Sequence, residues 1–295
     1  MEKSVMFNAR LRKSEINTWL NLLDSTSETD ARNRDLVERF LLLPESITFV
    51  SSLESKIIGG TSIYRDRKRS AMVLATVAVN ENYRESAAFQ IIKSSMPFFK
   101  TVAIRDVDVL VPQNDEPNKL GFPLSFDLEP WTKDIIQRIG FSEIGVLKHC
   151  SFSVEPDSSG KPTVWNEKVN EEESSELIWD QSKPMGLTNS LVWLARDFAL
   201  ANRNFEALAI DEHIVALAGF WKIDDTLCVL PLVSDPLRIE WKDLAAKLLI
   251  EARRRKTRHM DLSLLGEGQQ DLVQALEESC SLTSCRKLSL LRKQL

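Results

Sequence analysis

The chain has 295 residues, 43% of them hydrophobic and 27% charged, with a formal net charge of −5. This length predicts two domains of about 150 residues each, and the acidic balance argues against a general nucleic-acid binder, whose surface would be basic. The sequence has no apolar run long enough to span a membrane and no secretory signal core in residues 1–15, so we expect a cytoplasmic protein.

The first half of the chain predicts strands and helices in alternation. Residues 4–10 indicate a short strand, and an apolar stripe from Leu11 to Leu23 indicates a helix with Ser14 as its N-cap. The β-branched run 46–79 predicts a three-stranded meander. The other predicted elements are a helix at 31–43, a helix at 85–99, a strand at 105–112, a helix at 130–140 and a strand pair at 141–154.

Residues 155–185 differ in composition from what precedes them. Serine, proline, glycine and acidic residues predominate, which is typical of a linker. Trp165 and Trp179 lie in this stretch, and a wholly solvated linker seldom carries tryptophan. We therefore expect part of it to pack against one of the domains.

The second half repeats the order of elements of the first. It predicts a meander at 204–233, a helix at 241–256, a strand at 259–266, a helix at 269–279 and a last strand at 284–293. The turn Val79–Arg84 matches Val233–Arg238 at an offset of 154 residues. The same order at nearly constant spacing indicates a tandem duplication. We predict domains at 1–154 and 186–295, with 155–185 as the linker between them.

The four cysteines, Cys150, Cys228, Cys280 and Cys285, do not have the spacing of metal ligands. We expect reduced thiols, although Cys280 and Cys285 are close enough in sequence to meet. The three histidines are scattered, so no zinc site and no histidine-based triad is predicted. No metal is expected.

The order β-α-α-β-β-β-α-β-α-β, the turn ending in Tyr83-Arg84, and the pair Gly140-Phe141 after the last helix of the first half resemble the GNAT superfamily of acyl-CoA N-acyltransferases. The resemblance covers residues 4–154 and, less closely, 190–292. It implies an α/β fold of two GNAT-like domains, each a mixed twisted sheet flanked by helices.

The resemblance also implies a site for acetyl-CoA or another acyl-CoA. In the family the fourth strand holds the pantetheine arm, and a loop of the form Gln/Arg-x-x-Gly-x-Gly/Ala directs backbone N–H groups at the pyrophosphate. In this chain the strand offers Val77 and Val79. The loop offers Arg84, Glu85, Ser86, Ala87 and Ala88. Alanine replaces the first glycine here, and Trp241 stands at that position in the second half, where an indole should block the phosphate.

The family's usual catalytic groups are missing. Ile136 stands where many members carry a tyrosine that protonates the leaving thiolate, and the fourth strand has no carboxylate to act as a base. Glu81, after that strand, and Asn114 are the remaining candidates. Asp106 and Asp108 share one face of the strand at 105–112 and face either solvent or the acceptor cleft. The long segment 113–131, with Phe122, Phe126 and Trp131, either walls an acceptor pocket or covers the core.

Our first hypothesis is an N-acyltransferase, in particular an N-acetyltransferase, acting on a small-molecule or peptide amine. The N-terminal domain would be active and the C-terminal domain structural. The alternative is a catalytically inactive GNAT-fold binding or scaffolding protein. A second alternative is an acyl-carrier-protein-dependent acyltransferase that uses the basic turn 65–69 as its dock.

Overall fold

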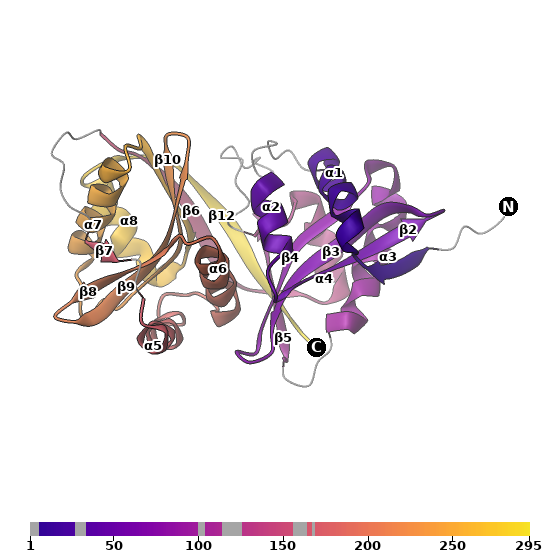
Figure 1. Ribbon diagram of the computed structural model, residues 1–295, viewed down its shortest axis with the longest axis horizontal. Coiled ribbons are helices and arrows are strands. Elements are labelled where there is room, and N and C mark those ends of the chain that lie inside the picture. The colour runs from indigo at the N-terminus through magenta and orange to yellow at the C-terminus, as the bar shows by residue number, and fades with distance from the viewer. Residues whose placement is uncertain (1–5, 27–33, 100–103, 114–125, 156–163, 167–168) are drawn as a thin grey trace. The chain divides into compact units, whose positions relative to one another are not determined.

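The computed structural model of the protein describes residues 6–26, 34–99, 104–113, 126–155, 164–166 and 169–295. Its contacts divide the chain into two compact units, which are drawn in Figure 1. Unit 1 comprises Met1–Ile144 together with Ser289–Leu295, and unit 2 comprises Gly145–Leu288. The last seven residues of the sequence therefore belong to the unit that begins it.

Unit 1 is a twisted mixed sheet with helices on both faces. Its elements are β1 (Phe7–Arg10), a 3-10 turn at Lys13–Glu15, α1 (Ile16–Thr26), α2 (Arg34–Leu41), β2 (Ser46–Leu53), β3 (Lys56–Asp66), β4 (Ala71–Val79), α3 (Glu81–Phe99), β5 (Asp106–Pro112), a 3-10 turn at Pro130–Thr132 and α4 (Lys133–Ile139). The strand order is β1-β2-β3-β4-β5, with the end of β12 (Ser281–Gln294) beside β5. Neighbours from β1 to β4 are antiparallel, whereas β4 and β5 are parallel.

Alternation along the strands of unit 1 separates two apolar layers. The side chains of Val77 and Val79 face a core that includes α3 and α4. Ala78, between them, faces Trp19 of α1. Gly60 on β3 permits that packing, because a Cβ there would lie 2.9 Å from the Trp19 ring and 2.2 Å from the Phe49 carbonyl.

Unit 2 repeats this arrangement. Its elements are β6 (Ser142–Ser153), β7 (Trp165–Asn166), α5 (Glu171–Gln181), α6 (Asn189–Ala201), β8 (Phe205–Ile210), β9 (His213–Ile223), β10 (Thr226–Ser234), α7 (Trp241–Arg254), β11 (His259–Leu265), a 3-10 turn at Glu267–Gln269 and α8 (Gln270–Glu277). The strand order is β6-β11-β10-β9-β8-β7. Leu248 of α7 and Leu272 of α8 pack into the core on one face. Phe198 of α6 stacks on Trp221 of β9 on the other, with ring centroids 5.0 Å apart.

The strands that close the two sheets come from unexpected parts of the sequence. The predicted strand pair at 141–154 is instead one strand, β6, whose residues 150–153 pair antiparallel with β11 in unit 2. The last strand, β12, ends beside β5 in unit 1, where Leu295 donates its N–H to the Arg105 carbonyl at 2.8 Å. Each unit therefore completes its sheet with a strand that follows the last helix of the other half.

The stretch predicted as a linker at 155–185 contains packed structure. Trp165 in β7 is buried, with its ring 5.0 Å from that of Phe220. Helix α5 begins at the N-cap Asn170, whose side chain accepts hydrogen bonds from two backbone N–H groups, and it buries Leu177 and Ile178. Part of the stretch packs on unit 2, as the two tryptophans suggested.

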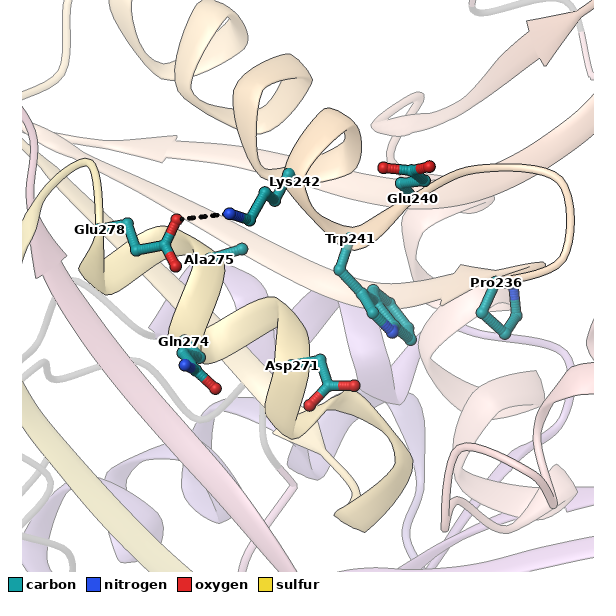
Figure 2. Close-up of a pocket in the computed structure, with 8 residues that line it drawn as sticks. All are labelled: Pro236, Glu240, Trp241, Lys242, Asp271, Gln274, Ala275 and Glu278. Atoms are coloured by element: carbon teal, nitrogen blue, oxygen red, sulfur yellow. Dashed lines mark ion pairs between the residues drawn. The ribbon is translucent and has the colours of Figure 1, made fainter.

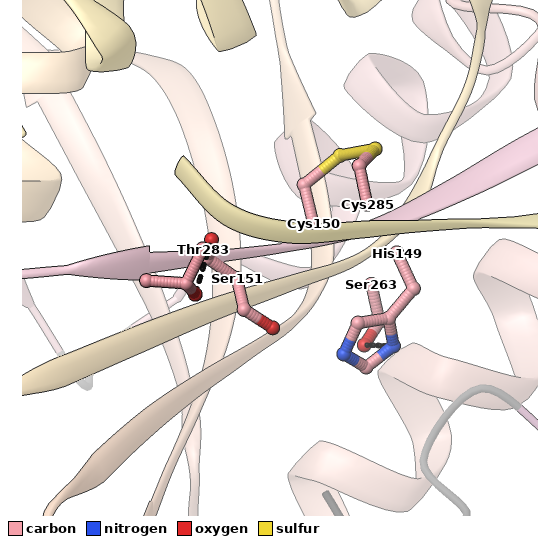
Figure 3. The surroundings of a disulfide bond; sticks show 6 residues. All are labelled: His149, Cys150, Ser151, Ser263, Thr283 and Cys285. Carbon is pink, nitrogen blue, oxygen red and sulfur yellow. Dashed lines mark hydrogen bonds between the residues drawn. A yellow bond between two sulfur atoms is a disulfide. The ribbon is translucent and has the colours of Figure 1, made fainter. Parts of the chain in front are cut away.

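Unit 2 contains a disulfide between Cys150 on β6 and Cys285 on β12, with the two Cα atoms 4.1 Å apart (Figure 3). The expectation of reduced thiols is therefore wrong for this pair, which lies 135 residues apart in sequence. The two cysteines meet because β6 and β12 are neighbours in the sheet. Cys228 is buried and free, and Cys280 is partly exposed and free.

Across the described ranges, no helix is long and apolar enough to cross a membrane. The same residues contain no cluster of three or more His, Cys, Asp or Glu side chains placed to hold a metal ion.

Candidate functional site

The candidate site lies in unit 1, where the parallel strands β4 and β5 separate after a short stretch of pairing. These two strands are in register at Val73 and Asp108 alone. The ladder between β4 and β3 shifts next to that point and leaves Ala75 without a partner, which is a β-bulge. A bulge bends its strand and redirects the groups that follow it. We call the stretch of β4 after the bulge, with the facing part of β5, the splay.

Val77 and Val79 direct their backbone groups into the splay. Asn80 donates its N–H to the Ile58 carbonyl on β3 at 2.8 Å, so the backbone groups of Asn80 point toward β3. Consecutive residues of a strand turn their backbone groups to opposite edges. Val77 and Val79 therefore face β5, and in the described part of the chain they have no ladder partner there. These are the two strand residues for which pantetheine contact was predicted.

The β5 side of the splay is occupied by the chain itself. Leu128 donates its N–H to the Leu110 carbonyl at 2.8 Å, and Asp127 forms a parallel bridge with Leu110. The Arg105 carbonyl accepts from the Leu295 N–H, so the backbone groups of Arg105 point toward β12. Leu110 is an odd number of residues further along, and its backbone groups therefore point to the opposite edge, toward β4. Residues 126–128 thus lie along β5 inside the splay.

Two side chains hold this segment in place. The Phe126 ring lies 5.6 Å from that of Phe40 on α2, and Leu128 is buried in the core. The φ of Phe126 is +53°, in the left-handed region that costs a bulky residue free energy. Of the two roles open to residues 113–131, the part at 126–128 covers the core. Phe122 and Asn114 lie outside the described residues.

The predicted phosphate loop is helical. Helix α3 begins at Glu81, so Ser86, Ala87 and Ala88 are its sixth to eighth residues. Beyond the first turn of a helix, each N–H donates to the carbonyl four residues earlier. The predicted contact between pyrophosphate and the amides of Ser86 to Ala88 therefore does not fit this arrangement. The Glu85 and Ser86 side chains are exposed, whereas Ala88 is buried against the sheet.

The N–H groups at the start of α3 are capped by Asn80. Its side-chain oxygen accepts from the Asn82 N–H at 3.1 Å, and its carbonyl accepts from the Tyr83 N–H at 2.8 Å. These first-turn amides are the ones that could otherwise bind an anion. The sequence carries a signal for this cap, because asparagine directly before a helix is a favoured N-cap.

Arg84 is the cationic group of the site. Its guanidinium lies 4.8 Å from the centre of the Trp131 ring, and its Nη2 lies 3.9 Å from a Glu81 oxygen. Both the Nε of Arg84 and the indole Nε1 of Trp131 are buried, and neither has a hydrogen-bond partner among the residues that the structure describes. Two neighbouring buried donors that lack an acceptor favour an anion or another acceptor at this point.

Core residues stand where the usual catalytic acid was expected. Ile136 on α4 is fully buried in the core of unit 1. Tyr64 is fully buried on β3, and Tyr83 on α3 packs partly buried against the same core. Glu81, the predicted alternative base, is exposed in the first turn of α3.

Asp106 and Asp108 belong to the scaffold. The buried Asp108 accepts two hydrogen bonds from Arg292 on β12, at 2.7 and 3.0 Å, and Asp106 lies 3.9 Å from the same guanidinium. The hydrogen bonds that Arg292 donates to Asp108 raise the pKa of the guanidinium, whereas burial acts in the opposite direction. No spacing in the sequence pointed to this partner, which lies 184 residues away.

In unit 2 the corresponding splay is closed. Strands β10 and β11 pair from Thr226 to Val229, after which β10 shifts register. The buried Gln269 accepts from the Gly266 N–H at 3.0 Å and donates its amide to the Leu232 carbonyl on β10 at 3.1 Å. Its side chain therefore links β10 to Gly266, the residue directly after β11. Arg238, the counterpart of Arg84, is paired with Asp235 at 3.3 Å.

Comparisons with known proteins give a likeness in structure. No family model matches the chain, and no curated protein matches it in sequence. A putative acetyltransferase from Pyrococcus horikoshii superposes with a TM-score of 0.65 at 10% identity, covering 100% of this chain and 92% of that one. A GCN5-related N-acetyltransferase from Sphaerobacter thermophilus gives 0.60 at 9% identity, covering 98% and 95%.

A third structure shares the duplication. It is a tandem GNAT protein from the clavulanic acid biosynthesis pathway, with a TM-score of 0.62 at 10% identity and 98% of each chain covered. Identities this low establish the fold and leave the activity open. The chain has the fold of the tandem GNAT proteins.

Proposed function

We propose that the chain is an acyl-CoA-dependent N-acyltransferase of the N-acetyltransferase type, with the chemistry in unit 1 and a structural role for unit 2. The observation that carries the proposal is the bulged edge of β4, where Val77 and Val79 face the splay without a ladder partner among the described residues. The pantetheine arm of CoA carries two amides and can pair with such an edge as an added strand does. The solved structures with this fold that are described as acetyltransferases support the same activity.

Arg84 is the group in unit 1 suited to the pyrophosphate. Its guanidinium has a buried Nε–H that finds no acceptor within the described ranges, and arginine binds phosphate oxygens through such charged donors. Asn80 already caps the helix, so the side chain of Arg84 replaces the backbone cradle that the family uses. A cofactor held in this way binds less tightly than one held by several amides.

The transfer step needs an amine placed against the thioester carbonyl. The amine nitrogen forms the new C–N bond, the C–S bond breaks, and the thiolate takes a proton from solvent. Orientation supplies most of the acceleration in such a site. Glu81, exposed beside the end of β4, accepts the proton lost by the amine, directly or through water. The acceptor would be a small-molecule or peptide amine.

A second candidate is a binding or scaffolding protein without acyl transfer. It is favoured by the bond between Leu128 and Leu110, which fills one side of the splay, and by the cap at Asn80. In that case residues 126–128 close the splay of unit 1, and neither unit binds CoA.

The deciding experiment is a thermal shift with CoA, acetyl-CoA and longer acyl-CoAs. At about 100 times the dissociation constant, a ligand stabilises the folded state by about 2.7 kcal/mol. We expect a higher unfolding midpoint for the wild type and for Arg238→Ala, the matched control in unit 2, and little change for Arg84→Ala. No shift with any CoA at millimolar concentration would overturn the enzyme proposal and leave the binding protein. Where binding is found, thiol release with a panel of amines, slower in Glu81→Gln, tests the transfer.

A further inference from the structure

A second site lies in unit 2, at the start of α7. A pocket of about 490 Å³ opens between α7 and α8, within the size range of small-molecule sites. The residues that line it come from the turn before α7, its first turn and the facing side of α8. They are Pro236, Glu240, Trp241, Lys242, Asp271, Gln274, Ala275 and Glu278. Figure 2 shows the Trp241 indole between Asp271 and Pro236.

The charges in this pocket are the reverse of those that a phosphate needs. Three carboxylates and one ammonium line it. Lys242 is paired with Glu278 at 3.1 Å, which leaves Glu240 and Asp271 with no ion pair among the described residues. Arg238, the one nearby cation of the turn, is paired with Asp235. An anion at this position would meet uncompensated negative charge.

Trp241 supplies the face on which a cation can rest. It is the first residue of α7, and it is partly buried against the core of unit 2, which fixes the ring. A cation over an indole face is attracted by the ring quadrupole, and nearby carboxylates add to that attraction. The Gln274 side chain, from α8, adds an amide oxygen that can accept a hydrogen bond.

We propose that this pocket binds a small organic cation with a primary ammonium or guanidinium group. The cationic head lies on the Trp241 ring between Glu240 and Asp271, and the aliphatic body follows Pro236 and Ala275. A bare metal ion does not fit, since no group of three or more carboxylate, cysteine or histidine side chains in the described ranges is placed to hold one. The site does not depend on the acyl transfer proposed for unit 1.

The test is a titration of the full chain with agmatine and spermidine at low ionic strength, followed by the indole N–H resonances in an NMR spectrum. The chain has seven tryptophans, and Trp241→Phe identifies the resonance of Trp241. We expect that resonance to shift in a saturable manner while the others move little. Isothermal titration calorimetry on the same samples gives the dissociation constant.

The variants separate this site from general attraction to an acidic protein. Trp241→Ala weakens binding about two- to thirtyfold. Trp241→Phe keeps an aromatic ring at this position and retains part of the affinity, so it shows whether a loss in Trp241→Ala comes from misfolding. Asp271→Asn and Glu240→Gln each weaken it by up to about fivefold. Asp243→Asn is the matched control, because Asp243 lies in the same first turn of α7 but does not line the pocket.

Three results would overturn the proposal. They are no shift of the Trp241 resonance at 10 mM amine (about the limit of a useful affinity), an equal loss of affinity in Asp243→Asn, or a larger shift with inorganic pyrophosphate than with either amine.

Discussion

Arg292 donates two hydrogen bonds, of 2.7 and 3.0 Å, to the buried carboxylate of Asp108, and this pair joins the last strand of the chain to β5. Both residues belong to unit 1, although the chain builds the whole of unit 2 between them. The edge of the candidate site is therefore held by residues at the end of the sequence.

Arg292→Ala should lower the free energy of unfolding of unit 1 by about 3 kcal/mol. Removing one partner leaves the Asp108 carboxylate buried without its cation, and the value is at the low end for a buried pair because Arg292 is about a third exposed. Urea unfolding followed by circular dichroism measures the change. Asp106→Asn, which weakens only the 3.9 Å contact of a partly exposed group, should cost under about 1 kcal/mol. Equal losses in the two variants would contradict this assignment.

The disulfide between Cys150 and Cys285 should stabilise unit 2 by about 2–4 kcal/mol, because it closes a loop of 135 residues in the unfolded chain. Cys285→Ser should lower the unfolding midpoint, and Cys280→Ser, at a free cysteine, serves as the control. Thiol labelling of the unreduced, denatured chain should find two reactive cysteines. Labelling of all four would show that the bond does not form.

Asp261→Asn should stabilise the protein at neutral pH. Burial raises the pKa of this carboxyl to about 6, although Ser151 and the nearby His259 act in the opposite direction. A carboxyl whose pKa is higher in the folded than in the unfolded state contributes stability below about pH 4 and loses it as the pH rises through 6.

The difference in unfolding free energy between Asp261→Asn and the wild type should therefore grow by about 3 kcal/mol from pH 4 to pH 7.5. Denaturant unfolding at several pH values tests this. Asp225→Asn, which removes a largely exposed carboxylate, is the control for the loss of one negative charge. The prediction is refuted if the difference in unfolding free energy between Asp261→Asn and the wild type stays constant from pH 4 to pH 7.5.

Phe126→Ala should raise the affinity of unit 1 for CoA by up to about tenfold, if CoA binds as proposed. The substitution removes the ring contact with Phe40 that holds residues 126–128 in the splay, a contact worth about 0.5–1.5 kcal/mol. Calorimetric titration with CoA measures the change. Phe98→Ala, which removes a stacked pair with Phe49 at 4.6 Å elsewhere in the unit, is the control. Unchanged or weaker binding in Phe126→Ala would show that the segment does not compete with CoA.

Local patterns in the sequence determined much of this protein. Apolar residues at helical spacing predicted α1 and α7, and β-branched runs predicted the meanders. The repeated turn at Arg84 and Arg238 indicated the duplication. These features depend on residues within one or two turns of each other, so composition and period encode them. The N-cap at Asn80 belongs to the same class, because an asparagine at that position is a local signal for the start of α3 at Glu81.

The tertiary structure alone decided how the sheets close and what fills the site. The pairing of Asp108 with Arg292, of Cys150 with Cys285 and of Leu110 with Leu128 joins residues that no local period relates. Such pairs follow from the order and register of the strands. The alternation of apolar and polar residues does not determine either, because every half-buried strand has the same alternating pattern whichever strand it pairs with. The sequence thus predicts two sheets with their helices, whereas the exchange of the last strands and the occupied splay emerge only when the chain has folded.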